Sequence, residues 1–372
     1  FTDLNAYDLV FASSVNGKPE RRAVLRADCK PGETVHIAFP FALPEAGLSC
    51  MTVAAVQRAA LPGIPAGYEA AFGQIWYKYA EARLTAAAPE LVEMDCNIGV
   101  KGEGFEYIFG RGKGLVSIRY NGVQLLDDTV RPNFWRAPTN NDEGCAEPFA
   151  FAFWKTAGLY ARCDHLTAET RGEFVTVRAV YTLPDGQTLP IDFAIDGAGR
   201  CDITMTWQGE RTEVPEFGLL FPLRRELTEV SYLGLGLRET TADRTAGGKM
   251  DTWSCNVRQD FARNSPVYPQ ECGSRTGVYR AALTGRDTEM SGIGFAGDGM
   301  TFSALPYTPH ELENARHLYE LPRDDNKTVV RCAAFQRGVG GDNSWGAKPH
   351  ADACFAVEKG MTFSFSIQKQ NG

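Results

Sequence analysis

Short stretches in which apolar and polar residues alternate most strongly constrain how this chain can fold. Clear examples are residues 175–181 (VTVRAVY), 203–207 (ITMTW) and 362–367 (TFSFSI). Period-two alternation is typical of strands that bury one face. Tight-turn dipeptides such as Asn121-Gly122 and Asp185-Gly186 separate such stretches. We therefore predict an all-β protein, with the clearest helices confined to short segments around residues 149–158 and 309–315.

A domain boundary is expected near residues 83–90. The segment 84–90 (LTAAAPE) is rich in small residues and contains a proline, as linkers often do. The residues before it are enough for a small β-sandwich, and those after it are enough for a larger all-β unit. The sequence therefore predicts two domains, residues 1–86 and residues 87–372.

The charge balance and the cysteines restrict the partners of the chain. Its formal charge of −8 and pI of about 5.3 argue against nucleic acid or an anionic membrane surface. The ten cysteines include no C-x-x-C pair, and the five histidines show no metal-ligand spacing. We expect free thiols in a reducing cytoplasm and no metal site. The chain begins at Phe1 without an initiator methionine, so we expect that the true N-terminus is missing.

Five segments in a fixed order carry a resemblance to a known family. They are residues 131–142 (RPNFWRAPTNND), 234–244 (GLGLRETTADR), 269–275 (PQECGSR), 307–321 (YTPHELENARHLYEL) and 336–346 (QRGVGGDNSWG). Together they resemble the signature of the small-chain domain, the last domain of glycoside hydrolase family 2 β-galactosidases. Five positions depart from the family pattern: Leu237, Thr240, Thr241, Cys272 and Asn343.

The N-terminal part of the chain extends this resemblance. Residues 1–7 (FTDLNAY), with Gly67, Glu69 and Gln74, are similar to the β-sandwich that follows the catalytic barrel in this family. The resemblance thus covers essentially the whole chain, as the C-terminal region of such an enzyme. It implies an immunoglobulin-like β-sandwich over residues 1–86 and a galactose-mutarotase-like β-supersandwich over residues 87–372.

The chemistry of the family belongs to a region that we do not find in this sequence. Its members hydrolyse terminal β-D-galactose residues with two glutamates on a (β/α)₈ barrel, one an acid/base and the other a nucleophile. No repeated βα pattern occurs here. We therefore expect no catalytic residue in this chain and no turnover by the chain alone. The resemblance places Mg²⁺ and Na⁺ in the barrel of the parent enzyme and implies no cofactor in this chain.

Trp345 is the sharpest candidate for substrate binding. It lies in a glycine-rich loop, where a tryptophan often stays partly exposed. A flat indole face suits the C–H face of a sugar ring, and the resemblance implies a platform for the aglycone sugar at the mouth of the barrel. The alternative is a tryptophan that packs in a corner of the fold. We expect Asp342 and Asn343 to bend this loop, and we include both among the substrate-binding candidates.

The signature segment 131–142 supplies two further groups of candidates. The resemblance implies that Asn141, Asp142 and Gly144 belong to a loop that borders the active site, where Gly144 permits hinge-like motion. Trp135 is expected to pack in the core. The two arginines, Arg131 and Arg136, are expected to hold carboxylates or carbonyls in place.

Other charged residues in the motifs favour a structural role. Five of them are expected to form a buried charged network, although a relict sugar pocket is the alternative: Glu239, Asp243, Arg244, Glu271 and Arg275. His317 is expected to be a structural hydrogen-bonding residue.

Three functions fit these residues. The first is an auxiliary part of a β-galactosidase that completes the active-site wall and binds an oligosaccharide together with the barrel, within an oligomer of the intact enzyme. The second is a stand-alone carbohydrate-binding module. The third is a mutarotase-like enzyme in which His317 acts with Glu271 or Glu320. Titration with galactose or lactose separates the first two, and a mutarotation assay tests the third.

Overall fold

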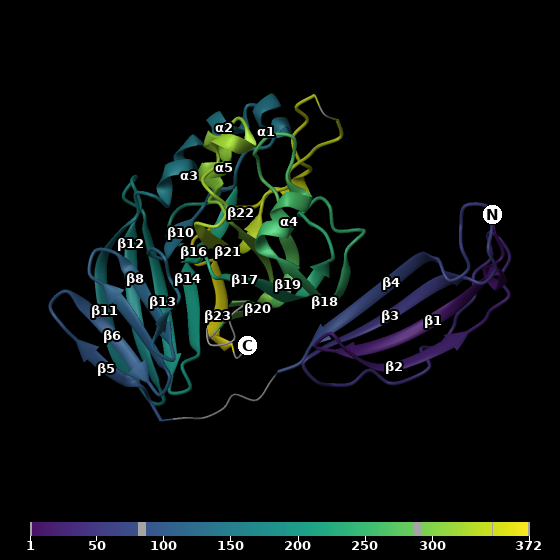
Figure 1. Ribbon diagram of the computed structural model, residues 1–372, viewed down its shortest axis with the longest axis horizontal. Helices are drawn as coiled ribbons and strands as arrows, with labels where there is room; N and C mark the ends of the chain where they lie inside the picture. The colour runs from purple at the N-terminus through teal and green to yellow at the C-terminus, as the bar shows by residue number, and fades with distance from the viewer. Residues whose placement is uncertain (1, 81–86, 286–291, 344, 371–372) are drawn as a thin grey trace. The chain divides into compact units, whose positions relative to one another are not determined.

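The computed structural model describes residues 2–80, 87–285, 292–343 and 345–370 (Figure 1). The chain divides into two compact units. The smaller comprises Phe1–Arg83 with Lys249–Thr252, and the larger comprises Leu84–Gly248 with Trp253–Gly372. The predicted domain boundary at residue 86 falls in the segment 81–86, outside the described residues.

The small unit contains a four-stranded antiparallel sheet in the order β2-β1-β3-β4. Its strands are β1 (Tyr7–Val15), β2 (Lys18–Leu25), β3 (Leu48–Gln57) and β4 (Glu69–Lys78), and the short helix η1 (Leu4–Ala6) precedes them. On β1, alternate side chains from Leu9 to Ser13 are buried, as period-two patterning requires.

The small unit differs from the predicted immunoglobulin-like sandwich. The strands between residues 7 and 78 form one sheet, and the segment 26–47 runs beside it without a strand. Phe39 lies edge-on against Phe11 with ring centroids 5.5 Å apart, so part of this segment packs on the sheet. The segment contains Pro31, Pro40 and Pro44. Proline has no backbone N–H for a strand ladder, which disfavours regular strand pairing at these three positions.

The large unit is built on an antiparallel sheet of twelve strands within the described residues. The main path runs β10 (Arg131–Asn133), β16 (Glu216–Arg224), β21 (Lys327–Gln336), β20 (Gly292–Leu305), β23 (Thr362–Gln370), β14 (Cys201–Thr206), β13 (Thr188–Asp196), β12 (Phe174–Thr182) and β11 (Arg162–Arg171). Three more strands join through β20: β19 (Arg275–Gly285), β17 (Leu227–Gly236) and β18 (Lys249–Asn256). Of β18, only the part from Trp253 onward is grouped with the large unit. The three alternating stretches of the sequence lie in β12, β14 and β23, so the predicted strands and the all-β class are confirmed.

A five-stranded sheet packs against this large sheet. It comprises β5 (Glu90–Glu93), β6 (Asn97–Gly102), β7 (Phe105–Gly110), β8 (Gly114–Tyr120) and β9 (Val123–Gln124), and a separate pair joins β15 (Thr212–Glu213) to β22 (Ala356–Val357). Phe109 of β7 meets Phe193 of β13 edge-on, with ring centroids 4.9 Å apart. Both side chains are fully buried, and each contributes roughly 1.5–3 kcal/mol by leaving water. Part of the core of the large unit therefore lies between these two sheets, and the core continues among residues of the large sheet such as Phe221 and Phe295.

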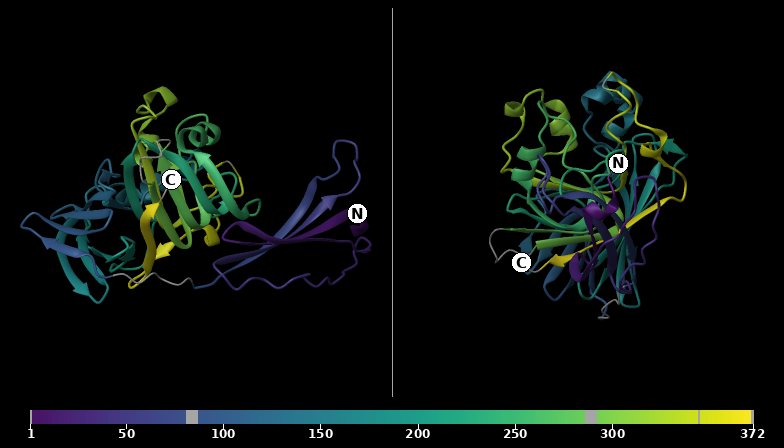
Figure 2. Two further views of the ribbon diagram at one scale, coloured as in Figure 1. Left: turned by 60° about the horizontal axis from the view of Figure 1, so that its bottom comes forward. Right: turned by 90° about the vertical axis from the view of Figure 1, so that its right-hand side faces the viewer.

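The helices are short, and most of them gather at one end of the large unit (Figures 1 and 2). They are α1 (Asn140–Gly144), α2 (Glu147–Ala150), α3 (Ala152–Ala157), α4 (Val257–Asn264), α5 (Pro309–Asn314), η2 (Leu318–Glu320) and η3 (Ala351–Ala353). The predicted helices around 149–158 and 309–315 are confirmed by α2, α3 and α5. Helix α1 lies beside the loop 338–350, which carries Trp345 (Figure 1).

Candidate functional site

Trp345 presents its indole to solvent, with 90% of the residue exposed. Its backbone N–H donates to Oδ1 of Asn343 at 2.8 Å, so the Asn343 side chain does bend the loop. Oδ1 of Asp342 instead lies 2.6 Å from Nε2 of His350, in an ion pair across the same loop. Trp345 is thus not a corner-packing residue within the large unit. Sugar contact by these three residues stays a prediction.

Charged side chains hold the first half of the loop 338–350: Arg136 and Arg337 are buried, and Asp243 is exposed. The guanidinium of Arg136 donates to the carbonyl oxygens of Arg337 and Gly338 at 3.1 and 2.7 Å. Arg337 is itself buried and pairs with Glu147 at 2.6 Å. On the other side, Oδ2 of Asp243 accepts from the backbone N–H groups of Val339 and Gly340, each at 2.8 Å. The chain thus enters the loop along a fixed path.

Arg136 and Asp142 form the central ion pair of this support. Their two hydrogen bonds measure 2.6 and 3.0 Å, and both residues are nearly inaccessible, at 3% and 2% exposure. Burial alone would raise the pKa of the Asp142 carboxyl, but the charge and hydrogen bonds of Arg136, with hydrogen bonds from Thr139, lower it overall. Asp142 therefore stays ionised and holds Arg136 in place.

The structure shows that one prediction from the sequence, a loop around Asp142, is wrong. Asn141, Asp142 and Gly144 were expected in a loop, but they lie in the helix α1. Thr139 caps this helix: its Oγ1 accepts from the N–H of Asp142, and Asp142 accepts from the N–H of Thr139. This reciprocal capping box satisfies backbone donors that a short helix would otherwise leave unpaired.

Helix α1 holds the second half of the Trp345 loop. Nδ2 of Asn141 donates to the carbonyl oxygen of Ala347 at 2.7 Å. Gly144 packs directly on Gly346: a Cβ on Gly346 would meet the carbonyl oxygen of Gly144 at 2.6 Å. Gly346 also has a φ of +89°, which side chains rarely adopt. Close backbone packing thus joins the signature segment to the loop beside Trp345.

The remaining residues of the signature segment lie behind this support. Trp135 is buried, and its Nε1 donates to Oε2 of Glu313 at 2.9 Å. Arg131 makes a more exposed ion pair with Asp128 at 3.2 Å. These placements agree with packing and positioning roles rather than ligand contact.

The five charged residues expected to form one network occupy four separate groups. Glu239 pairs with Arg244 at 3.1 Å, whereas Asp243 binds the backbone of the Trp345 loop. Arg275 pairs with Asp260 at 2.6 Å, and Glu271 pairs with Arg331, which also contacts Glu216 at 2.7 Å. Sequence reasoning missed Asp260, Glu216 and Arg331, because no local pattern marks partners from other strands and helices.

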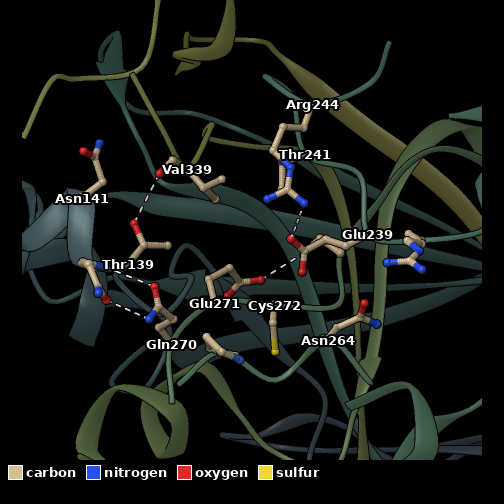
Figure 3. A pocket seen from close by; sticks show the side chains of 14 residues that line it. Thr139, Asn141, Glu239, Thr241, Arg244, Asn264, Gln270, Glu271, Cys272 and Val339 are labelled. Atoms are coloured by element: carbon tan, nitrogen blue, oxygen red, sulfur yellow. Dashed lines mark hydrogen bonds and ion pairs between the residues drawn. The ribbon is translucent and has the colours of Figure 1, made fainter. Parts of the chain in front are cut away.

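A polar pocket of about 500 Å³ lies between these groups (Figure 3). Thr139 and Asn141 border it on one side, Glu239 and Arg244 border it on another, and Glu271 lies between them. Burial raises the pKa of Glu239, and the nearby negative charge of Glu271 acts in the same direction. Charged motif residues thus contribute both to the support of the loop and to the wall of a pocket.

His317 does not lie near the buried glutamate. It is largely exposed, with its Nδ1 3.3 Å from Oε1 of Glu320 and its ring stacked on Tyr319. Glu271 is buried against Arg331 instead. A His317–Glu271 pair is therefore not formed, and the remaining His317–Glu320 pair is a surface contact.

The described part of the chain has neither disulfide bonds nor a cluster of metal-ligating side chains. Its ten cysteines are all free thiols. Residues 2–80, 87–285, 292–343 and 345–370 contain no group of three His, Cys, Asp or Glu side chains arranged to hold a metal ion. Within the same ranges, no helix has the length and apolar character needed to cross a membrane.

Two family models match the chain. Residues 101–367 match the model described as beta galactosidase small chain, and residues 1–78 match beta-galactosidase, domain 4. The first match includes Trp345, the signature segment and the charged groups around the pocket.

Curated relatives match over most of the chain. A beta-galactosidase of Lactobacillus delbrueckii subsp. bulgaricus is 34% identical over 99% of this chain and 37% of its own length. A beta-galactosidase small subunit of Latilactobacillus sakei is 31% identical over 73% of this chain and 95% of its own length. The chain thus spans about a third of the first of these relatives and nearly all of the second. Among solved structures, it is similar to a galactose 1-epimerase from Lactobacillus acidophilus, at 9% identity, with 77% of this chain and 100% of that chain covered and a TM-score of 0.41.

Proposed function

The chain belongs to the beta galactosidase small chain family, and on that premise we propose that it is the non-catalytic part of a glycoside hydrolase family 2 β-galactosidase. In this proposal, the two catalytic glutamates lie on a barrel that this chain does not supply. The present chain completes the wall of the active site and binds the aglycone sugar of a β-galactoside. A location in the cytoplasm forms part of the same proposal.

The observation that carries this proposal is an exposed tryptophan on a strongly held loop. Trp345 is 90% exposed, so its indole gains no hydrophobic stabilisation from burial in this chain. This exposure favours a role in contacting another molecule. Arg136, Asp243 and Asn141 hold the backbone on both sides of it. A sugar platform needs this combination, because a rigid support lowers the entropy lost on binding.

Trp345 would act on binding and orientation rather than on bond cleavage. Its flat face can cover the apolar C–H face of a sugar, and its Nε1–H can donate to a hydroxyl. Asp342 and Asn343 would shape the loop around it. The Mg²⁺ and Na⁺ implied by the family would be held by barrel residues. No step assigned to this chain depends on a metal.

Exposed aromatic side chains at the helical end of the large unit support the proposal that this end contacts a partner. Phe149 on α2 is 86% exposed, and Tyr319 on η2 is 81% exposed. Both elements lie at the helical end of the large unit with the Trp345 loop (Figure 1). Exposed aromatic side chains of this kind often mark interaction sites, so we assign this end to the contact with the catalytic barrel.

Substitution of Trp345 in the intact enzyme tests the proposal. Trp345→Ala should raise KM for a disaccharide by roughly tenfold, the effect of losing about 1.4 kcal/mol of binding. It should change kcat for an activated aryl galactoside much less, because that step needs no aglycone platform. Trp345→Phe, which keeps a flat ring, serves as the matched control and should retain most of the disaccharide affinity. An equal loss of kcat on both substrates would contradict the proposal.

A further inference from the structure

The polar pocket between α1, the segment 238–244 and the segment 264–274 has no role in the proposal for Trp345. Its volume of about 500 Å³ lies within the range of roughly 300–1,000 Å³ that is common for small-molecule sites. Thr241, Glu271 and Ser274 are buried residues that border it, whereas Arg238 and Asn140 are exposed. The pocket is thus large enough, and closed enough at its base, to hold a small ligand.

The charges of the lining favour a neutral ligand. Two carboxylates, Glu239 and Glu271, face the pocket together with two arginines, Arg238 and Arg244. Glu239 pairs with Arg244, and Glu271 pairs with Arg331 behind the wall. Neither sign of charge is in excess within the lining, so a strongly charged ligand has no electrostatic advantage here.

The same lining has hydrogen-bonding capacity of both kinds. A carboxylate can accept about four hydrogen bonds, and Glu239 accepts one from Arg244 and one from the N–H of Gly273. Asn264 donates from Nδ2 to Asp260, which leaves its amide oxygen as an acceptor. Arg244 keeps further N–H donors after its bond to Glu239. This mixture suits a ligand whose hydroxyl groups each donate and accept.

These side chains are also positioned before any ligand binds. Asp260 holds Asn264 with an oxygen–nitrogen distance of 2.8 Å, and Arg275 holds Asp260 at 2.6 Å. The N–H of Gly273 fixes Glu239 at 2.6 Å. Oδ1 of Asn141, another lining residue, is buried and accepts no hydrogen bond from the described residues. A preorganised wall with an unused buried acceptor is expected where a ligand or ordered water completes the hydrogen bonding.

We propose that this pocket binds a neutral monosaccharide in its pyranose form, through Glu239, Arg244 and Asn264. Its hydroxyl groups would replace ordered water and meet the donors and acceptors of the wall. The site is additional to Trp345 and does not depend on the proposed role of that residue, because the two bind through different side chains.

Titration of the purified chain with D-galactose, D-glucose and D-galacturonate tests this inference. Calorimetry should show saturable one-to-one binding of a neutral hexose, and NMR shifts should concentrate in residues 238–244 and 264–274. Glu239→Gln and Asn264→Ala should each weaken binding by about tenfold or more. Glu226→Gln is the matched carboxylate control, since Glu226 pairs with Arg224 outside the pocket lining, and it should leave the affinity within about twofold.

Several results would overturn the inference. Absence of saturable binding by all three sugars would mean that the pocket holds only water. Stronger binding of galacturonate than of either hexose would indicate an anion site at the arginines. Binding that is lost in Trp345→Ala but kept in Glu239→Gln would place the sugar on the loop instead. If Glu239→Gln fails to fold, Arg238→Ala at the exposed rim gives a second variant, with an expected loss of affinity of about threefold or more.

Discussion

At the scale of single residues, buried ion pairs define the path of the chain around Trp345. Arg136–Asp142 and Arg337–Glu147 are both nearly inaccessible to water. Removing charges from water is costly, so such pairs need not increase stability over an apolar core. Here Arg136 places charged donors against the backbone carbonyl oxygens of Arg337 and Gly338. We therefore interpret the two ion pairs as positioning groups. Their loss should lower the free energy of unfolding and displace the loop 338–350.

Removal of one member of the central pair gives a prediction. Arg136→Met should destabilise the large unit by roughly 3–5 kcal/mol, because it leaves the Asp142 carboxylate buried without its partner. Arg244→Met is the matched control: Arg244 pairs with Glu239, but its side chain is 57% exposed, and its loss should cost less than about 1 kcal/mol. Urea denaturation of both variants measures the difference. Equal destabilisation would contradict this account of the buried pair.

The His350–Asp342 pair predicts a pH dependence in the loop. The hydrogen bond and charge of Asp342 raise the pKa of His350 above its ordinary value of 6.5. The stabilising contribution is therefore complete below pH 6.5 and is lost as the pH rises through the raised pKa. An NMR titration of His350 should show this elevation, and Asp342→Asn should lower the pKa towards 6.5. A pKa of His350 at or below 6.5 in the wild-type protein would contradict a stabilising His350–Asp342 pair.

At the scale of elements, α1 and the loop 338–350 behave as one structural group. The capping box at Thr139 defines where α1 begins, and Asn141 then reaches the loop at Ala347. Gly144 and Gly346 allow the two backbones to touch. Movement of either element should therefore move the other.

A glycine substitution tests this coupling. Gly346→Ala should destabilise the protein by about 1 kcal/mol or more and displace the loop, because its Cβ would meet the backbone of Gly144 in addition to requiring a φ of +89°. Gly360→Ala is the control that measures only the free-energy cost of alanine at a positive φ. Gly360 has a φ of +88° and nothing within 4 Å of the added Cβ. Hydrogen exchange at residues 140–145 should accelerate in Gly346→Ala alone. Acceleration in both variants would mean that crowding at Gly144 is unimportant.

The sequence was sufficient to predict elements whose signal is local. Alternation predicted β12, β14 and β23, and the glycine-rich setting of Trp345 predicted its exposed loop. The pairing of Glu271 with Arg331 could not be predicted, because these residues lie 60 positions apart and meet only through the sheet. Helix α1 was mistaken for a loop, since a five-residue helix carries too little periodicity to be recognised.

At the scale of the whole molecule, the features used in both proposals belong to the large unit. This unit carries the exposed Trp345, the aromatic side chains of the helical end and the polar pocket. The chain spans 37% of one curated β-galactosidase but aligns with 95% of a small subunit. These two matches support the proposal that the chain is an auxiliary part of a larger enzyme.

Reconstitution of activity is the most direct test of this central claim. The chain alone, the catalytic barrel part alone and an equimolar mixture would each be assayed with a chromogenic β-galactoside and with lactose. We predict no turnover by the chain alone and a rise in lactose hydrolysis when the two parts are mixed, with a smaller rise for Trp345→Ala. Turnover by the purified chain alone, or a mixture no more active on lactose than the barrel part, would contradict the account.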